Sequence, residues 1–225
     1  MRVDPDKMAI VGRSGYGKST MMNRVMRSHK RIILFDHVDE REPEAANEGF
    51  TEVRDFNQLQ DLVDRNYKTG FRYWFHPDFR DNLIKHLHNV SDFMLDIQAD
   101  YGRTHGVENR PSLMLAVDEL KASCPNHALR KDEDMFSYMC SEGRHKGIHL
   151  IGATQRPAEV STKFKGQMEK IIMFNLNLGV DLDAIEAWGG KRDGKQLREA
   201  VRLLERLEYI RMENGAFTRG KLTFP

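Results

Sequence analysis

Short apolar runs alternate with longer segments of helical periodicity along most of the chain. The runs have the length of buried strands and occupy residues 8–11, 31–35, 71–75, 112–117, 148–153 and 171–174. Segments in which apolar residues recur every three or four positions predict helices at residues 18–27, 56–63, 78–97, 128–142 and 195–206. This alternation predicts an α/β fold with a mostly parallel sheet flanked by helices.

Turn and cap residues set the limits of several predicted elements. Asp55 has the residue type and the spacing to Gln58 of a helix N-cap, and Pro77 and Asp78 are expected to open the long helix that follows. The Asn-Gly dipeptide at residues 214–215 predicts the turn of a C-terminal β-hairpin, because both residues tolerate a positive φ.

The length of 225 residues suits a single large α/β domain. Residues 37–54 are charged and irregular in pattern, in contrast to the strand and helix segments on either side. We therefore expect one domain over residues 1–225, in which residues 37–110 form an elaborated insertion between core strands.

The first predicted strand runs into a glycine-rich segment that carries the most specific motif of the chain. Residues 12–19 match the pattern G-x-x-x-x-G-K-[ST] in full. Glycines in such a loop let backbone N–H groups close around phosphate oxygens, and the next helix points its positive N-terminus at them. A glycine-rich turn that binds nothing is the alternative, but the strand before the loop and the helix after it favour a nucleotide site. The expected nucleotide-binding residues are Gly12, Arg13, Ser14, Gly15, Tyr16, Gly17, Lys18, Ser19 and Thr20.

Two adjacent carboxylates, Asp118 and Glu119, follow the apolar run at residues 113–117. In P-loop enzymes the lysine of the loop reaches the β- and γ-phosphates, while the loop hydroxyl and an aspartate at a strand end hold Mg²⁺. We expect Lys18 in the first role, and Ser19 and Asp118 as the metal ligands. Glu119 is placed to orient and deprotonate a water molecule, which favours hydrolysis of ATP over transfer to another acceptor.

A polar pair, Thr154 and Gln155, ends the next predicted strand, and Pro157 prevents the strand from continuing. In a parallel sheet this strand end lies beside the phosphate crevice. Gln155 is therefore expected to hydrogen-bond the attacking water or the γ-phosphate. The alternative is a polar strand end that makes only turn hydrogen bonds.

Composition narrows the class of protein. Lys and Arg number 35 against 34 Asp and Glu, which argues against a uniformly basic nucleic-acid coat, so any DNA-binding surface must be local or built from several copies. Two cysteines without metal-site spacing indicate a reducing compartment. The first residues lack the apolar core of a signal peptide, and no apolar run approaches the ~20 residues that cross a bilayer. We expect a soluble protein that reaches a membrane only through partners.

Three segments together resemble the HerA–FtsK superfamily of DNA-pumping ATPases. They read GRSGYGKS at residues 12–19, LMLAVDE at residues 113–119 and GRHKGIHLIGATQRP at residues 143–157. The resemblance runs from residue 7 to about residue 212, more weakly after Pro157 through Asp181 and the Gly-Gly pair at 189–190, and leaves out residues 37–110. In size and layout the chain is similar to the genome-packaging ATPases of membrane-containing viruses such as tectiviruses and corticoviruses.

The resemblance implies a RecA-like P-loop NTPase core that assembles as a homo-oligomer, usually a hexameric ring. In such rings a basic residue of one subunit completes the site of its neighbour, and by motif position that residue is Arg144. An arginine in this role stabilises the charge on the transferring phosphoryl group. The alternative is that Arg144 caps its own helix end, where a cation suits the helix dipole, and Arg156 is then the substitute.

The resemblance implies a Mg-dependent ATPase that translocates double-stranded DNA and packages a viral genome into a procapsid. Its cofactors are ATP and Mg²⁺, and a capsid portal or a membrane protein is a further expected partner. Such a protein acts at the packaging vertex of the virion or in the host cytoplasm. A cellular or conjugative DNA pump and a DNA-independent nucleotide switch or assembly ATPase remain alternatives. A small-molecule kinase is disfavoured because Asp118, Glu119 and Gln155 suit the activation of water, and no arginine-rich lid is found.

Two basic clusters are candidates for DNA contact, although an ordinary solvated face explains each equally well. The first basic cluster is Lys163, Lys165 and Lys170, and the second basic cluster is Lys191, Arg192 and Lys195.

Overall fold

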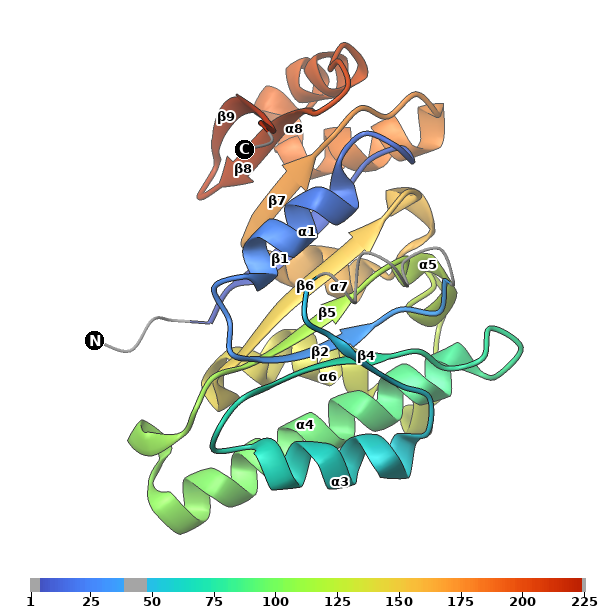
Figure 1. The fold of residues 1–225 in the computed structure, drawn as a ribbon. Helices are drawn as coiled ribbons and strands as arrows, with labels where there is room; N and C mark the ends of the chain where they lie inside the picture. Colours follow the sequence, from blue (N-terminus) through green and yellow to red (C-terminus); the bar gives the residue numbers. More distant parts are fainter. Residues whose placement is uncertain (1–4, 39–47, 224–225) are drawn as a thin grey trace.

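The protein is described by a computed structural model that covers residues 5–38 and 48–223. These residues form one nine-stranded sheet with helices on both faces (Figure 1). The strands are β1 (Lys7–Val11), β2 (Arg31–Phe35), β3 (Thr51–Val53), β4 (Phe71–Phe75), β5 (Leu113–Val117), β6 (Ile148–Thr154), β7 (Lys170–Met173), β8 (Glu208–Glu213) and β9 (Ala216–Lys221). The α-helices are α1 (Lys18–Met26), α3 (Phe56–Asn66), α4 (Leu83–His105), α5 (Leu120–Ser123), α6 (Met135–Glu142), α7 (Thr162–Gln167) and α8 (Gly179–Arg202). Short 3₁₀ turns are η2 (Val107–Asn109), η3 (Lys131–Glu133), η4 (Gly143–Lys146) and η5 (Pro157–Glu159).

The sheet has the strand order β3-β4-β2-β5-β6-β1-β7-β8-β9. The strands from β3 to β7 pair in parallel, and β8 and β9 add an antiparallel hairpin at one edge. The predicted fold class, a mostly parallel α/β sheet with a C-terminal hairpin, is confirmed.

The two faces of the sheet are covered unequally. On one face, Met8 and Ile10 of β1 pack in a cluster with Met21 and Met22 of α1. On the other face, Ala9 and Val11 of β1 join a larger cluster with residues of α3 to α8. Figure 1 shows α1 on one side of the sheet and α4 and α6 on the other. Because the helix after β1 and the helices after the later strands lie on opposite faces, a crevice opens at the carboxyl ends of the strands near β1.

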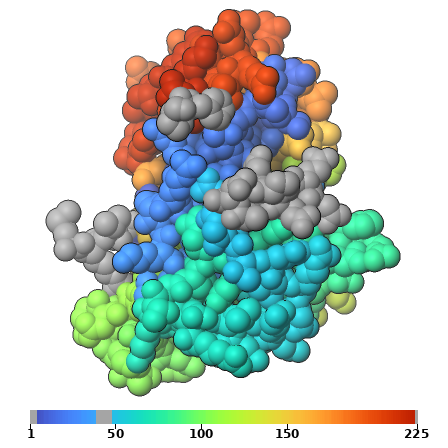
Figure 2. Space-filling view, in the orientation of Figure 1, coloured from blue at the N-terminus to red at the C-terminus, as the bar shows by residue number. Residues whose placement is uncertain are grey.

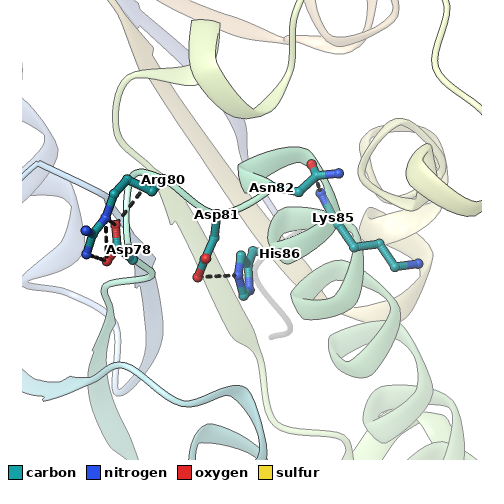
Figure 3. A network of polar contacts seen from close by, with 6 residues as sticks. All are labelled: Asp78, Arg80, Asp81, Asn82, Lys85 and His86. Carbon is teal, nitrogen blue, oxygen red and sulfur yellow. Dashed lines mark hydrogen bonds and ion pairs between the residues drawn. The ribbon is translucent and has the colours of Figure 1, made fainter.

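The long helix α4 begins later than predicted. The side chain of Asp78 turns back to its own loop, where Oδ1 accepts a hydrogen bond from the Arg80 backbone N–H at 2.9 Å and the carboxylate pairs with the Arg80 guanidinium. Asn82 instead provides the N-cap, accepting from the backbone N–H of Lys85 at 3.0 Å (Figure 3). The helix therefore starts at Leu83, and the expectation that Pro77 and Asp78 open it is wrong.

Two other helices differ from their predicted limits. Instead of a helix over residues 128–142, α6 covers only Met135–Glu142, because Glu133 binds back to Arg130 and closes a separate tight turn. The helix expected at residues 195–206 begins at Gly179 and ends at Arg202. It is broken at Gly190, whose φ is 68°.

A close approach of backbones explains the break in α8. A Cβ atom built on Gly189 would lie 2.6 Å from the Cα atom of Gly194, so the two halves of α8 touch through glycines. The spacing of apolar residues in the sequence does not predict that a helix folds back on itself. Neither α8 nor any other helix within residues 5–38 and 48–223 is long and apolar enough to cross a bilayer.

A short strand lies in the segment that the sequence pattern describes as irregular. β3 covers Thr51–Val53 and pairs in parallel with β4, and residues 39–47 of that segment lie outside the described residues. The predicted cap and turn are confirmed. The Asp55 carboxylate accepts from the Gln58 backbone N–H at 2.8 Å, and the dipeptide at 214–215 has φ angles of 51° and 74°.

A buried histidine lies at the start of β6. His149 is 4% exposed, its Nδ1 accepts from the backbone N–H of Asp6 at 3.1 Å, and its ring lies 4.4 Å from that of His29. The pKa of His149 is lowered to about 4, chiefly by burial. The positive charges of His29 and Lys170 also lower this pKa, whereas the carboxylate of Asp6 acts in the opposite direction. The native state therefore binds a proton at His149 less readily than the unfolded chain does.

Acidification is expected to destabilise the fold through this residue. An unfolded histidine titrates near pH 6.5, so the contribution of His149 to the free energy of unfolding is complete above that pH. It is lost as the pH falls from 6.5 to about 4, by about 3 kcal/mol. The stability advantage of the wild type over His149→Gln should shrink by that amount across this range in urea unfolding. His127→Gln, at an exposed position, is the matched control. A wild-type advantage that is independent of pH would contradict the assignment.

Candidate active site

The segment between β1 and α1 has the backbone shape of a phosphate-binding loop. Gly12, Gly15 and Gly17 have φ angles of 150°, 77° and 115°, which other residues rarely adopt. A Cβ atom on Gly12 would lie 2.5 Å from Cβ of Phe174, so a larger residue cannot replace it without displacing Phe174, which directly follows β7. Helix α1 begins at Lys18 directly after the loop and no side chain caps it, which leaves its N-terminus open to a ligand.

Lys18 lies folded into this loop. Its side chain is largely buried, with the residue 7% exposed, and Nζ donates to the carbonyl oxygen of Arg13 at 3.2 Å. Lys18 also borders the cavity in front of the loop. A buried cation at this point attracts anionic ligands more strongly than an exposed one, because little water screens it.

The two carboxylates after β5 face the same cavity. The backbone N–H of Asp118 donates to the carbonyl oxygen of Phe35 in β2 at 2.9 Å, which fixes the strand end. Glu119 has a left-handed backbone with φ of 50°, an uncommon conformation for a residue with a side chain. The hydroxyl of Thr154 donates to Oε1 of Glu119 at 3.2 Å and so ties β5 to the end of β6.

The carboxyl group of Glu119 holds a proton more strongly than a free glutamate does. Burial raises its pKa above 4.5, and the nearby carboxylate of Asp118 raises it further. The ammonium of Lys18 and the hydrogen bond from Thr154 act in the opposite direction. A carboxylate whose pKa is raised in this way is a stronger base towards a bound water molecule.

A single cavity of about 400 Å³ brings the predicted residues together, a volume within the range of small-molecule sites. It is lined by Ser14, Gly15, Gly17, Lys18, Ser19, Thr20, Asp36, Val38, Asp118, Glu119, Gln155, Arg206 and Leu207. The predicted phosphate loop, both predicted metal ligands, Glu119 and Gln155 therefore share one space.

Three predicted nucleotide-binding residues shape the loop rather than line the cavity. Gly12 packs on Phe174, as described above, and its N–H donates to the carbonyl oxygen of Thr154 at 3.2 Å. The guanidinium of Arg13 lies over the ring of Tyr16 at 5.2 Å and reaches Oδ1 of Asn175 at 3.4 Å. These contacts attach the loop to the ends of β6 and β7.

The two candidate arginines lie in different places. Arg144 is in η4, before β6, and therefore at the opposite end of that strand from Gln155, roughly 20 Å from the cavity at ~3.3 Å per residue. Its side chain is 42% exposed and pairs with Glu169 at 3.1 Å. Arg156 follows Gln155 but pairs with the buried carboxylate of Asp181 at 2.9 Å.

Four residues that line the cavity were not among the predicted site residues. Asp36 borders the cavity and is 1% exposed. It follows the apolar strand β2 directly, as Asp118 follows β5, and this position in the sequence could have identified it as a site residue. Val38 lies two residues further on. Arg206 and Leu207 come from the segment after α8, and neither carries a motif that identifies it in the sequence.

The two basic clusters are arranged differently. In the first basic cluster, Lys163 pairs with Asp134, Lys165 donates to the carbonyl oxygen of Pro157, and Lys170 pairs with Asp6. The second basic cluster lies next to the break in α8, and its side chains are largely exposed. Arg192 there is 94% exposed, with only a long 3.8 Å contact to Asp193 among the described ion pairs. The second basic cluster is therefore the more available for an external anion.

Solved structures share the fold of this chain over almost its whole length. The genome packaging NTPase B204 of Sulfolobus turreted icosahedral virus 2, in complex with AMPPCP, matches with a TM-score of 0.71 and 19% identity, over 97% of this chain and 98% of that one. B204 of Sulfolobus turreted icosahedral virus matches at 0.65 and 22%, over 99% and 100%. The pCW3 conjugation coupling protein TcpA with ATPγS matches at 0.57 and 13%, over 97% and 60%.

The chain has the fold of the B204 packaging NTPases. No protein-family model matches its sequence, and no characterised protein matches it by sequence alone. The similarity is therefore one of structure, and it includes neighbours that hold ATP analogues.

Proposed function

We propose that this chain is an ATPase of the HerA–FtsK superfamily that translocates double-stranded DNA and packages a viral genome. The observation that carries the proposal is the shared cavity, in which Ser14, Gly15 and residues 17–20 of the phosphate loop border the same space as Asp118, Glu119 and Gln155. The B204 fold supports the packaging role, with a higher TM-score than the conjugation protein gives.

The residues of the cavity fit Mg-ATP. Positive φ angles at the three loop glycines and the open N-terminus of α1 suit phosphate oxygens. The ammonium of Lys18 suits the β- and γ-phosphates, and the hydroxyl of Ser19 with the carboxylate of Asp118 supplies the oxygen ligands that Mg²⁺ prefers. Bound there, Mg²⁺ would neutralise charge that develops on the phosphate oxygens.

Glu119 is the proposed general base. It takes a proton from water while the water oxygen bonds to the γ-phosphorus, and the bond from that phosphorus to the β,γ-bridging oxygen breaks to give ADP and phosphate. Thr154 holds Oε1 of Glu119 in place. Gln155, which follows Thr154 at the end of β6, is the proposed hydrogen-bond partner of the water or the γ-phosphate.

Arg144 is the proposed arginine finger, supplied by a neighbouring subunit. It lies at the far end of β6 from its own cavity, with an exposed side chain, so it serves only another subunit's site. Arg156 is held by Asp181 within its own chain and is less suited to the role. Head-to-tail contacts of this kind close into rings, and we propose a hexamer.

The wider setting follows from the same proposal. The chain is one ATPase domain, with residues 37–110 as an elaborated insertion, and it acts at the packaging vertex or in the host cytoplasm. A capsid portal or membrane protein is the proposed docking partner. A conjugative pump is the second candidate, favoured by the fold of TcpA, and a DNA-independent nucleotide switch is the third.

The second basic cluster is the proposed DNA contact. Replacing Lys191, Arg192 and Lys195 together by Gln should lower DNA-stimulated ATP turnover and leave turnover without DNA unchanged. Each lost phosphate contact should also reduce the salt dependence of DNA binding by about 0.9 in the slope of log K against log salt. Fluorescence anisotropy with a double-stranded oligonucleotide measures that slope.

The paired substitution of Lys163 and Lys165 by Gln is the matched control, because both side chains are engaged within the chain. If this control loses DNA stimulation and the triple variant keeps it, the assignment is wrong. Wild-type turnover that DNA does not change would favour the nucleotide switch.

A mixing experiment tests the role of Arg144 in a neighbouring site. Arg144→Ala and Glu119→Gln should each lower ATP turnover by about 10²-fold or more when assembled alone. In mixed rings, an Arg144→Ala subunit keeps Glu119 in its own ATP site. A neighbouring Glu119→Gln subunit supplies Arg144 to that site. Random mixing of equal amounts should therefore restore roughly a quarter of the sites, because half of the subunits keep Glu119 and half of their neighbours supply Arg144.

Native mass spectrometry confirms that the two variants co-assemble. Arg156→Ala, mixed with Glu119→Gln in the same way, is the control for a residue held within its own chain. Co-assembled rings of Arg144→Ala and Glu119→Gln without recovered turnover would show that Arg144 does not act across the interface.

A further inference from the structure

The segment between α8 and β8 reaches the phosphate loop from the C-terminal part of the chain. Nε of Arg206 donates to the carbonyl oxygen of Gly15 at 3.2 Å, and Arg206 and Leu207 both border the cavity. A Cβ atom on Gly17 would lie 3.2 Å from Cδ2 of Leu207, so the segment also packs against the base of the loop. Figure 2 shows the C-terminal residues, in red, against the N-terminal residues, in blue.

The backbone of this segment is held in an unfavourable conformation. Leu207 has φ of 69°, in the left-handed region that residues with side chains rarely adopt. Its carbonyl oxygen accepts from the N–H of Leu222 at 2.9 Å, and the N–H of Glu205 donates to Oε2 of Glu208 at 2.9 Å. Strain of this kind persists where several contacts enforce it, and it concentrates at ligand sites.

Asn175 connects the same segment to the other side of the loop. Its side-chain amide donates to the carbonyl oxygens of Arg202 at 2.8 Å and Leu204 at 3.0 Å. Its own carbonyl oxygen accepts from the backbone N–H of Arg13 at 2.9 Å. The position of Arg206 over the loop is therefore fixed by contacts from the start of β8 and from the residues that follow β7 and β9.

The guanidinium of Arg206 has donors left for a ligand. Within residues 5–38 and 48–223, Nε is the only atom of this group that makes a hydrogen bond. The side chain is exposed and borders the cavity that Lys18 also faces. A guanidinium binds phosphate oxygens through two nitrogens at once, and that arrangement is available here.

The strand order decides which part of a nucleotide Arg206 meets. Glu119 follows β5 and approaches β1 across β6, whereas Arg206 precedes β8 and approaches from across β7. The two side chains therefore reach the loop from opposite sides of β1. If Glu119 faces the γ-phosphate, Arg206 faces the part of the nucleotide that ATP and ADP have in common.

We propose that Arg206 binds the phosphates that a nucleoside triphosphate shares with its diphosphate product, with Leu207 packed against the nucleoside. The inference rests on the proposed ATP site and adds a residue that the motifs do not contain. It also links the C-terminal hairpin to the nucleotide within one subunit.

Isothermal titration calorimetry with ADP and with the β,γ-methylene analogue of ATP tests the proposal. Arg206→Ala should weaken the binding of both ligands by a similar factor, about 10-fold or more, because a charge-assisted hydrogen bond is lost from each. Arg206→Gln keeps a donor for the Gly15 carbonyl oxygen and should show the same loss with the loop conformation retained. Arg202→Ala, an exposed arginine in the last turn of α8, is the matched control and should bind as the wild type does.

The outcomes separate this inference from the proposed function. A loss confined to the triphosphate analogue would place Arg206 at the γ-phosphate and overturn the inference, as would unchanged binding in both Arg206 variants. A wild type that binds neither ligand would instead overturn the proposed ATPase, whatever Arg206 does.

Discussion

The parallel register of β1, β5 and β6 is the constraint on which the site depends. Val11 of β1 pairs with Thr154 of β6, and Val117 of β5 pairs with Gly152 of β6. The carboxyl ends of the three strands consequently lie side by side, and the phosphate loop, the carboxylate pair and Gln155 follow directly after them. A slip of one residue in any pairing would turn the side chains of that strand to the opposite face.

Packing around Gly152 holds this register. A Cβ atom there would lie 2.3 Å from Leu120 and 2.5 Å from Phe164, so the helices after β5 and β6 rest directly on the backbone of β6. The same contact keeps Glu119, one residue before α5, close to Thr154. Burial at this point raises the pKa of Glu119, while Lys18 offers the opposing charge. Packing and the chemistry of the site are thus consequences of one close approach.

Local patterns were sufficient to predict the strands other than β3 and to place the phosphate loop, the carboxylate pair and Gln155 at strand ends, because each is encoded by neighbouring residues. Features that arise from distant contacts were not predictable. Helix α8 folds back through the contact of Gly189 with Gly194, and periodicity alone does not show this. Arg206 is about 190 residues from the loop it touches, and its place depends on the left-handed backbone of Leu207. The proposed role of Arg144 involves a second subunit, which neither the sequence nor one chain contains.

The role of Glu119 as general base is tested most directly by comparing ATP binding and ATP turnover in the wild type and in Glu119→Gln. Gln keeps the oxygen that accepts from Thr154 but cannot take a proton from water. We expect the variant to bind ATP as tightly as the wild type and to turn it over about 10²- to 10⁴-fold more slowly. Equal turnover in the two proteins, or a wild type that does not bind ATP, would contradict the proposed ATPase site.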